Sequence, residues 1–351
     1  VEGKVVCCDN IKLACKRFLS DLQRNDLDFR EDVVDNAISF IGILKHFAGK
    51  SSGNPFILKD GNIYNTNILG FYWKDTDNRR FTSSYIEVSR KNGKTALAAA
   101  LCMYFLIADG EDGAEVDLAQ IKGIAKIAFN FCSNFAKQLD PSAKYLKAYR
   151  DSILLNANDS KLKVFAADDS KLDGFNASFG LVDEYHSAKT LGLGMLLNLY
   201  GNEVESAFMH ITTAGFDKTL PCYKLRTTAI EILNGLKEDD SLFVAIYSLD
   251  EEDDWTDEKN WIKCTPNLDV TVTKKYIKNS TIAINNPSEE VGVKTKTLNL
   301  WCDTASVWLP ESYIVRNSQT VKLSDFKDCV CYVGVDLAAT SDLTAVSYLI
   351  E

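Results

Sequence analysis

The turn Gly93-Lys94-Thr95 constrains the fold of this chain more than any other feature. A β-prone run, residues 84–88, precedes it, and an apolar run with helical spacing, residues 96–108, follows it. Strand, glycine turn with Lys-Thr, then helix is the context of a phosphate-binding P-loop. Backbone N–H groups of such a turn and the dipole of the following helix both favour an anion. We therefore expect Lys94 to contact phosphate oxygens and the Thr95 hydroxyl to hold Mg²⁺.

One position departs from the usual P-loop pattern. The pattern begins with a further glycine, and Val88 occupies that place here. Taken alone, the motif also fits a lysine and a threonine at an ordinary helix start. The P-loop interpretation predicts a phosphate-contacting set of Arg90, Lys91, Asn92, Gly93, Lys94 and Thr95.

A second informative stretch is an apolar run that ends in two acids. Residues 179–182 are typical of a buried strand, and Asp183 and Glu184 follow directly. Ligands of open α/β sheets bind beyond the carboxyl ends of strands. There, Asp183 is expected to hold Mg²⁺ and Glu184 to polarise the water that attacks the γ-phosphate. Two acids at an ordinary strand end are the alternative, which the upstream P-loop disfavours.

Two threonines end another predicted strand, residues 208–212. The hydroxyls of Thr212 and Thr213 are expected to hydrogen-bond the γ-phosphate or the water and to report hydrolysis to the rest of the molecule. As the third motif in this order, they favour a translocase or helicase over a metabolic kinase. His186 is open to two interpretations: a second sensor, or a histidine hydrogen-bonded at a helix start.

The remaining sequence alternates between helical and strand patterns, as a mostly parallel α/β sheet requires. The fold class is therefore α/β, a P-loop NTPase core in which helices flank a mostly parallel sheet. Helices are predicted at 96–108, 123–138, 191–200, 223–236, 276–283 and 294–300. Strands are predicted at 114–118, 153–155, 162–166, 179–182, 208–212 and 242–248. Residues 9–48 predict two amphipathic helices with a polar break at 25–28.

Composition excludes some classes of protein. Hydrophobic residues make up 46% and charged residues 25% of the 351 residues, as in soluble globular proteins. No apolar run approaches the roughly 20 residues that span a bilayer, and residues 1–4 hold no signal-peptide core. We therefore expect no membrane association and a cytoplasmic location.

The ten cysteines predict neither disulfides nor a zinc site. No C-x-x-C pair exists, and none of the three histidines stands at ligand spacing from a cysteine pair, so reduced thiols are expected. The net charge of −10 argues against a general nucleic-acid binder. A ring-shaped assembly can nevertheless carry lysines and arginines on its inner face.

Two adjacent arginines, Arg79 and Arg80, stand just before the predicted P-loop strand. They are suited to contact phosphate, DNA or a neighbouring subunit. A solvated basic turn is an equally good interpretation of the same pair.

Together these motifs resemble the large subunit of tailed-bacteriophage terminases. The resemblance runs from about Ala37 to the end of the chain. It is carried by residues 89–95, 179–186, 212–215, 249–255, 266–268 and 298–301. Terminase P-loops often replace the first glycine and carry an arginine at the place of Arg90, so Val88 fits this family.

The resemblance implies an ATP-driven motor that moves double-stranded viral DNA into a procapsid in the host-cell cytoplasm. It implies a P-loop ATPase followed by an RNase H-like nuclease, with ATP and Mg²⁺ as cofactors. The implied partners are double-stranded DNA, the portal protein, a small terminase subunit and further copies of the chain in a ring, a pentamer. Four parts are expected: an N-terminal helical appendage (1–50), the ATPase core (51–248), a lid or linker subdomain (249–326) and the start of the nuclease (327–351).

The resemblance also assigns roles to individual residues. Glu184 would be the catalytic carboxylate. Arg90 would be an arginine finger within its own subunit, or Arg150 one acting on a neighbour's nucleotide, and the sequence leaves this choice open. The family often reads adenine with a glutamine before the P-loop, where this chain offers only Asn62.

The predicted strand 331–338, with 343–349 as its hairpin partner, resembles the beginning of the nuclease, and Asp336 would be a metal ligand. Two-metal nucleases need several carboxylates. The sequence ends at Glu351 before others follow, so this chain is not expected to cut DNA by itself.

Two alternative functions share the same nucleotide site. A nucleic-acid helicase fits the three motifs, but no second motor domain with its own arginine motif is recognisable after Gly215. A non-catalytic scaffold fits less well, because Lys94, Asp183 and Glu184 are all present.

Overall fold

The computed structural model describes residues 5–47, 51–109, 112–120, 125–166, 177–189, 206–282, 287–303, 316–318, 322–337 and 344–351. The chain divides into two compact units, Val1–Val307 and Trp308–Glu351, and each is described by itself.

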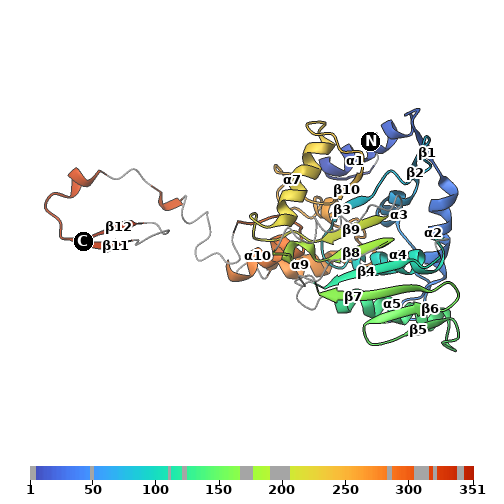
Figure 1. The fold of residues 1–351 in the computed structure, drawn as a ribbon. Helices are drawn as coiled ribbons and strands as arrows, with labels where there is room; N and C mark the ends of the chain where they lie inside the picture. The colour runs from blue at the N-terminus through green and yellow to red at the C-terminus, as the bar shows by residue number, and fades with distance from the viewer. Residues whose placement is uncertain are drawn as a thin grey trace. The chain divides into compact units, whose positions relative to one another are not determined.

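A sheet of eight described strands forms the centre of the first unit (Figure 1). In spatial order the strands are β10 (Leu242–Ile246), β3 (Ser83–Glu87), β9 (Ala207–Thr212), β8 (Phe179–Asp183), β4 (Glu115–Gln120), β7 (Ser160–Ala166), β6 (Ser152–Leu155) and β5 (Leu146–Ala148). The strands from β10 to β7 run parallel, whereas β6 and β5 add in antiparallel fashion. This confirms the predicted α/β class and places β9 between β3 and β8.

Helices cover both faces of the sheet, as a parallel sheet requires. They are α1 (Asp9–Asp21), α2 (Glu31–Ile43), α3 (Asp60–Thr66), α4 (Lys94–Ile107), α5 (Ala125–Leu139) and α7 (Pro221–Leu233). Every residue of α4 from Ala96 to Leu106 is buried, because the helix is apolar on all sides and packs against the sheet, α2 and α5. The helix predicted at 191–200 lies outside the described residues.

Side-chain alternation along the strands separates two cores. On β3, Ile86 joins the core that contains α4 and α5, whereas Tyr85 joins the one that contains α7. On β8, Leu181 and Val182 divide between the same two cores. Because successive strand residues point to opposite faces, each residue contributes to one core, and the polar groups lie at the strand ends.

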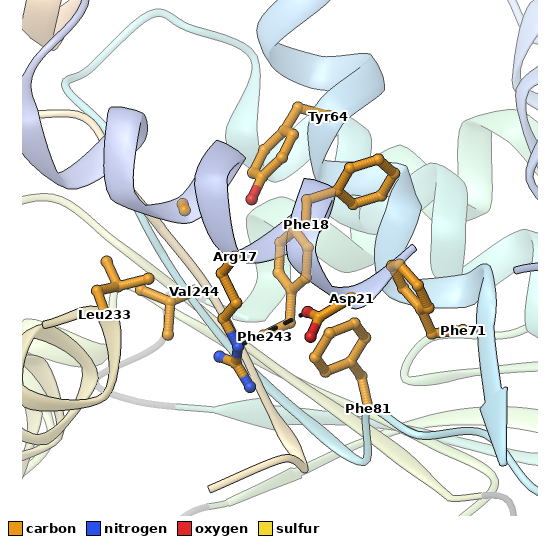
Figure 2. A pocket seen from close by; sticks show the side chains of 10 residues that line it. Arg17, Phe18, Asp21, Tyr64, Phe71, Phe81, Leu233, Phe243 and Val244 are labelled. Atoms are coloured by element: carbon orange, nitrogen blue, oxygen red, sulfur yellow. Dashed lines mark ion pairs between the residues drawn. The ribbon is translucent and has the colours of Figure 1, made fainter. Parts of the chain in front are cut away.

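Helix α1 is attached to the sheet by polar contacts beside an aromatic pocket. Figure 2 shows Arg17 and Asp21 of α1 pointing toward the aromatic side chains of Phe81 and Phe243. The Arg17 guanidinium donates to the carbonyl oxygen of Leu242 at 2.8 Å, at the start of β10. The N-terminal helix therefore belongs to the first unit rather than forming a free arm.

The interpretation of Arg79 and Arg80 as a solvated turn, or as contacts to phosphate or DNA, is wrong. Their side chains are only 5% and 1% exposed, respectively. Arg79 donates to Asp109 at 2.6 Å, and Arg80 pairs with Asp21 at 2.7 Å and with Asp240 at 2.6 Å. Each guanidinium is buried because a carboxylate from a distant segment is buried with it.

A small antiparallel ladder, β1 (Leu27–Phe29) with β2 (Phe71–Trp73), was not predicted, since residues 25–28 pattern as a polar break. The 3-10 helix η2 (Asn67–Leu69) precedes β2. Gly70 lets the two strands approach, because a Cβ there would collide with the Phe29 ring.

Residues 249–300 form a satellite of the first unit with its own small core. Its helices are α8 (Trp261–Cys264), α9 (Lys274–Ile282) and α10 (Pro287–Lys296), packed around the buried Trp261. The predicted helix 294–300 has the wrong bounds: α10 begins at Pro287, as suits a proline in a first turn, and ends at Lys296. There the chain turns back, with Asn299 at φ 57° and the Leu300 N–H bonded to the Lys294 carbonyl.

In its described residues, the second unit holds a short 3-10 helix, η5 (Leu323–Phe326), and an antiparallel hairpin of β11 (Cys331–Asp336) and β12 (Ala345–Ile350). The hairpin confirms the predicted strand pair, in which Asp336 lies opposite Ala345 at the last pairing position of β11. No described helix in either unit is long and apolar enough to cross a membrane.

Candidate nucleotide-hydrolysis site

The connection from β3 to α4 has the backbone of a phosphate-binding loop. Gly93 adopts φ 79°, a left-handed conformation that favours glycine, and the helix begins at the next residue, Lys94. Lys91 also has a positive φ, of 71°. Asn62 lies against this turn, since a Cβ on Gly93 would lie 3.8 Å from its side-chain amide. The loop thus places N–H groups and a helix N-terminus at one point.

Residues 265–271 form hydrogen bonds with the P-loop. Asn92 is buried, and its side-chain amide donates to Ser89 Oγ at 2.8 Å, while its Oδ1 accepts the N–H of Asn267 at 3.0 Å. Thr271 Oγ1 donates to the Lys91 carbonyl at 2.7 Å. The Asn92 side chain therefore faces the protein, and its predicted phosphate contact is left to its backbone.

The P-loop and the end of β8 meet directly. Thr95 Oγ1 donates to Asp183 Oδ2 at 2.9 Å, and Lys94 Nζ lies 3.0 Å from Glu184 Oε1. Glu184 stands in the left-handed region at φ 52°, an unusual conformation for a non-glycine residue, directly after the strand. The structure thus brings together four residues that the sequence places in separate motifs.

The pKa values of the two neighbouring acids, Asp183 and Glu184, are shifted in opposite directions. Burial raises the pKa of Asp183 to about 6, against the opposing effect of Lys94. Burial also acts to raise the pKa of Glu184, but the hydrogen bond from His186 and the charge of Lys94 outweigh it and hold that pKa below its usual range. Glu184 is therefore ionised at neutral pH.

Strand β9 lies between β3 and β8, and its end carries Thr212 and Thr213, both fully buried. Thr212 Oγ1 accepts the His186 N–H at 3.0 Å and lies 3.1 Å from its Nδ1. His186 Nδ1 is also 3.2 Å from Glu184 Oε2, and burial lowers the histidine pKa. His186, suggested above as a second sensor, therefore contacts both Glu184 and Thr212.

Lys296, the last residue of α10, also reaches the site and was missed in the sequence. Its Nζ lies 2.7 Å from His186 Nε2 and 3.1 Å from Thr213 Oγ1. Burial lowers its pKa to about 8. No sequence pattern indicates a role for Lys296, because a lysine near a helix end is common and the residues it contacts are far away in the chain.

A buried carboxylate at the end of β3 was missed as well. Glu87 is inaccessible to solvent and accepts from Tyr85 at 2.5 Å and from Trp301 Nε1 at 3.0 Å, and it pairs with Arg226 at 3.3 Å. Asn299 joins this cluster and accepts the N–H of Ala214 through Oδ1 at 2.7 Å. The cluster ties the strand before the P-loop to the segment after α10.

The two candidate arginine fingers lie at different points of the same sheet edge. Arg90 is exposed within the P-loop, and its N–H donates to the Lys296 carbonyl at 2.9 Å. Arg150 follows β5, which runs in the same direction as β3, so both connections lie at the carboxyl edge of the sheet. Its side chain is 90% exposed, and the sheet order places β5 at the opposite end from β10 and β3. The third metal candidate, Asp336, belongs to the second unit.

Among the described residues, no group of three or more His, Cys, Asp or Glu side chains is arranged to hold a metal by itself, and all ten cysteines are free thiols. The pair Thr95 and Asp183 fits Mg²⁺ in a different way. A hydroxyl and a carboxylate in contact supply hard oxygen ligands, and a bound nucleotide would supply others. This donor set is the one found in P-loop enzymes.

A P-loop at a helix N-terminus, a hydroxyl and an acid suited to a metal, and a second carboxylate, all at the carboxyl edge of a mostly parallel sheet, define a P-loop nucleoside triphosphatase. Residues 64–231 match the family model of the terminase large subunit ATPase domain, and residues 237–350 match that of its endonuclease domain. The chain belongs to the terminase large subunits, which confirms the resemblance seen in the sequence.

Curated relatives match different shares of the chain. Protein YmfN of Escherichia coli strain K12 is 33% identical over 180 residues, covering 50% of this chain and 40% of that protein. The terminase large subunit of Lactococcus phage p2 is 23% identical over 299 residues, covering 76% of this chain and 50% of that protein. The chain thus spans about half the length of the relatives it matches, or less.

A solved structure shares the fold. The crystal structure of the HK97 bacteriophage large terminase superposes with a TM-score of 0.63 at 17% sequence identity, covering 90% of this chain and 64% of that one. At this identity the match supports the architecture alone.

Proposed function

We propose that this chain is the ATP-hydrolysing motor part of a phage DNA-packaging machine. The observation that carries the proposal is the convergence of Lys94, Thr95, Asp183 and Glu184 at one edge of the sheet. Family membership supplies the biological context, and the site supplies the chemistry. A strand-separating helicase, the alternative left by the motifs, is disfavoured by the family assignment.

Triphosphate binding involves an exchange of partners at Lys94. Its ammonium contacts Glu184 Oε1, and the same ammonium is the group that a P-loop offers to the β- and γ-phosphates. Backbone N–H groups from Lys91 to Thr95 and the dipole of α4 receive the remaining phosphate charge. When Lys94 turns to the phosphates, one Glu184 oxygen becomes available to a water molecule.

Hydrolysis then depends on Glu184 as the group that orients and polarises that water. Its pKa is held below the usual range, so it remains a carboxylate and acts mainly by orientation and charge. When bound at Thr95 and Asp183, Mg²⁺ would neutralise phosphate charge during the reaction. Thr212 and Thr213 lie beside these groups and are suited to register the loss of the γ-phosphate.

We assign Arg150 to the nucleotide of a neighbouring subunit and Arg90 to that of its own. Arg150 is exposed at the correct edge of the sheet but at the opposite end from β10 and β3. A ring in which this end faces the next subunit's P-loop would place the guanidinium at that nucleotide. Arg90 belongs to the P-loop itself and needs no neighbour.

The remaining proposals concern the assembly. The motor would form a ring, a pentamer, on the portal of a procapsid in the host cytoplasm, act on double-stranded DNA and work with a small terminase subunit. Residues 249–326 would act as a lid subdomain between the ATPase core (51–248) and the nuclease that begins near 327, with Asp336 as its first metal ligand.

A packaging assay tests this proposal. Linear duplex, procapsids with portal, and the large subunit that contains this chain are incubated with ATP, and DNA protected from DNase is measured. Wild-type protein should protect DNA, and Glu184→Gln should not. Strand separation without protection would support a helicase and overturn the proposal.

A further inference from the structure

None of the three nucleotide-binding motifs assigns a role to Lys296, the last residue of α10. Its Nζ lies within hydrogen-bonding distance of three acceptors: His186 Nε2 at 2.7 Å, the Ala214 carbonyl at 2.9 Å and Thr213 Oγ1 at 3.1 Å. An ammonium group has three donors and no acceptor, so this set satisfies it completely. The side chain is thereby fixed between β9 and the residues that follow β8.

These contacts determine the protonation of His186. Because Lys296 can only donate, Nε2 must accept, and the histidine is then neutral with its proton on Nδ1. Nδ1–H then donates to Thr212 Oγ1 at 3.1 Å, and Glu184 Oε2 lies 3.2 Å from the same nitrogen. Burial lowers the His186 pKa, which is consistent with a neutral ring, and the Lys296 pKa of about 8 leaves the ammonium charged at neutral pH.

The two oxygens of Glu184 thus have different neighbours: Oε1 lies 3.0 Å from Lys94 Nζ, and Oε2 lies 3.2 Å from His186 Nδ1. Phosphate binding would withdraw Lys94, and among the described residues His186 is then the contact left to hold the carboxylate in place. A carboxylate that loses its orientation no longer aligns water for attack.

We propose that Lys296 is a positioning residue of the ATPase, which fixes His186 as the Nδ1–H tautomer so that this histidine orients Glu184 for hydrolysis. The role of Glu184 in this inference rests on the proposed function; the tautomer does not. Since Lys296 ends α10, outside the sheet, it also makes the orientation of Glu184 depend on the position of residues 249–300. Its carbonyl oxygen, which accepts the Arg90 N–H, ties the same residue to the P-loop.

The tautomer is measured directly by NMR. The chain has three histidines, so ¹⁵N-histidine labelling gives few signals, and His186→Gln identifies the one of interest. At pH 7 wild-type protein should show His186 protonated at Nδ1 alone. Lys296→Met should shift it toward Nε2–H or a mixture, and Lys296→Arg, which also only donates, should keep Nδ1–H. A wild-type Nε2–H tautomer, or a Met variant that leaves the tautomer unchanged, would overturn the proposal.

Kinetics test the consequence for catalysis. Lys296→Met should lower kcat for ATP roughly 10–100-fold with KM changed less than about threefold, because orientation is lost rather than binding. Lys294→Met, on the same helix but paired with Glu290, is the matched control and should keep kcat within about twofold. A Lys296→Met variant with unchanged kcat would contradict the positioning role.

Failure of the inference and failure of the proposed function give different results. A wild-type chain without ATP hydrolysis would overturn the proposed function. If the expected tautomers were found in such a chain, the Lys296–His186 link would stand and its catalytic role would be refuted with the proposed function. Normal wild-type hydrolysis with no effect of Lys296→Met would overturn the inference alone.

Discussion

Lys94 Nζ and Glu184 Oε1 lie 3.0 Å apart, which joins the P-loop to the strand-end acid by an ion pair. Both side chains are mostly buried, 8% and 19% exposed, respectively, so neither charge is well hydrated. The same ammonium must serve the phosphates. Competition between carboxylate and phosphate for Lys94 is therefore built into the site.

Removal of Lys94 should weaken nucleotide binding. Lys94→Ala deletes a charged hydrogen bond of about 1.5–3 kcal/mol, which corresponds to roughly a 10–100-fold loss of ATP affinity. Isothermal titration calorimetry with Mg-ATP measures it, and Lys137→Ala, which removes an exposed lysine on α5, is the control for a general loss of positive charge. Wild-type affinity in Lys94→Ala would remove the P-loop assignment.

Arg150 should matter only between subunits. Arg150→Ala should leave ATP affinity of the isolated chain unchanged and reduce hydrolysis by the assembled ring on the order of 10³-fold. Lys147→Ala, an exposed lysine on β5, should have little effect. Hydrolysis by the ring that is insensitive to Arg150 would leave Arg90 as the remaining candidate.

The buried Glu87 cluster should contribute to stability. Glu87→Gln leaves the Arg226 guanidinium without its carboxylate, and loss of one partner from a buried pair costs about 3–5 kcal/mol. Urea unfolding compares the variant with Glu238→Gln, which changes an exposed carboxylate elsewhere in the first unit. Equal stability of the two variants would show that the cluster contributes little.

Stability should fall with acid through His210. This histidine is buried, donates from Nδ1 to the Ser84 carbonyl at 3.0 Å, and finds no partner for Nε2 among the described residues. Burial lowers its pKa from 6.5 to about 4. Protons then bind the unfolded chain more tightly than the folded chain. The contribution of His210 to the free energy of unfolding is therefore complete above pH 6.5 and is lost as pH falls toward 4.

The size of that effect is about 2 kcal/mol between pH 7 and pH 5. It is measured as the difference in unfolding free energy between the two pH values for wild type and for His210→Asn. The variant should lose about 2 kcal/mol less than wild type over this interval. An identical pH dependence in both proteins would contradict the neutral, buried state of His210.

The sequence predicted the parts of the site that follow from local pattern. Gly93 and Lys94 mark a turn between a strand and a helix, and Asp183 ends an apolar run, so each is visible in a short window. Parallel strands bring their carboxyl ends to one edge, which is why motifs far apart in sequence meet. The antiparallel hairpin β11–β12 was predicted from the resemblance to the start of the terminase nuclease.

What was missed depends on packing between distant segments. Arg80 was interpreted as exposed because nothing near it in sequence shows that Asp21 and Asp240 will be its partners. Asn267 contacts Asn92 of the P-loop from 175 residues away, and Lys296 contacts Thr213 at the end of β9 from 83 residues away. Such contacts carry no periodicity, so only the folded structure reveals them.

The most direct test of the account is steady-state ATP hydrolysis by the Glu184→Gln variant, measured beside its ATP affinity. We predict that binding persists while turnover falls by about 10²–10⁴-fold, because the carboxylate that polarises the water is gone. Wild-type turnover in Glu184→Gln would contradict the assignment of this pocket as the ATP-hydrolysis site.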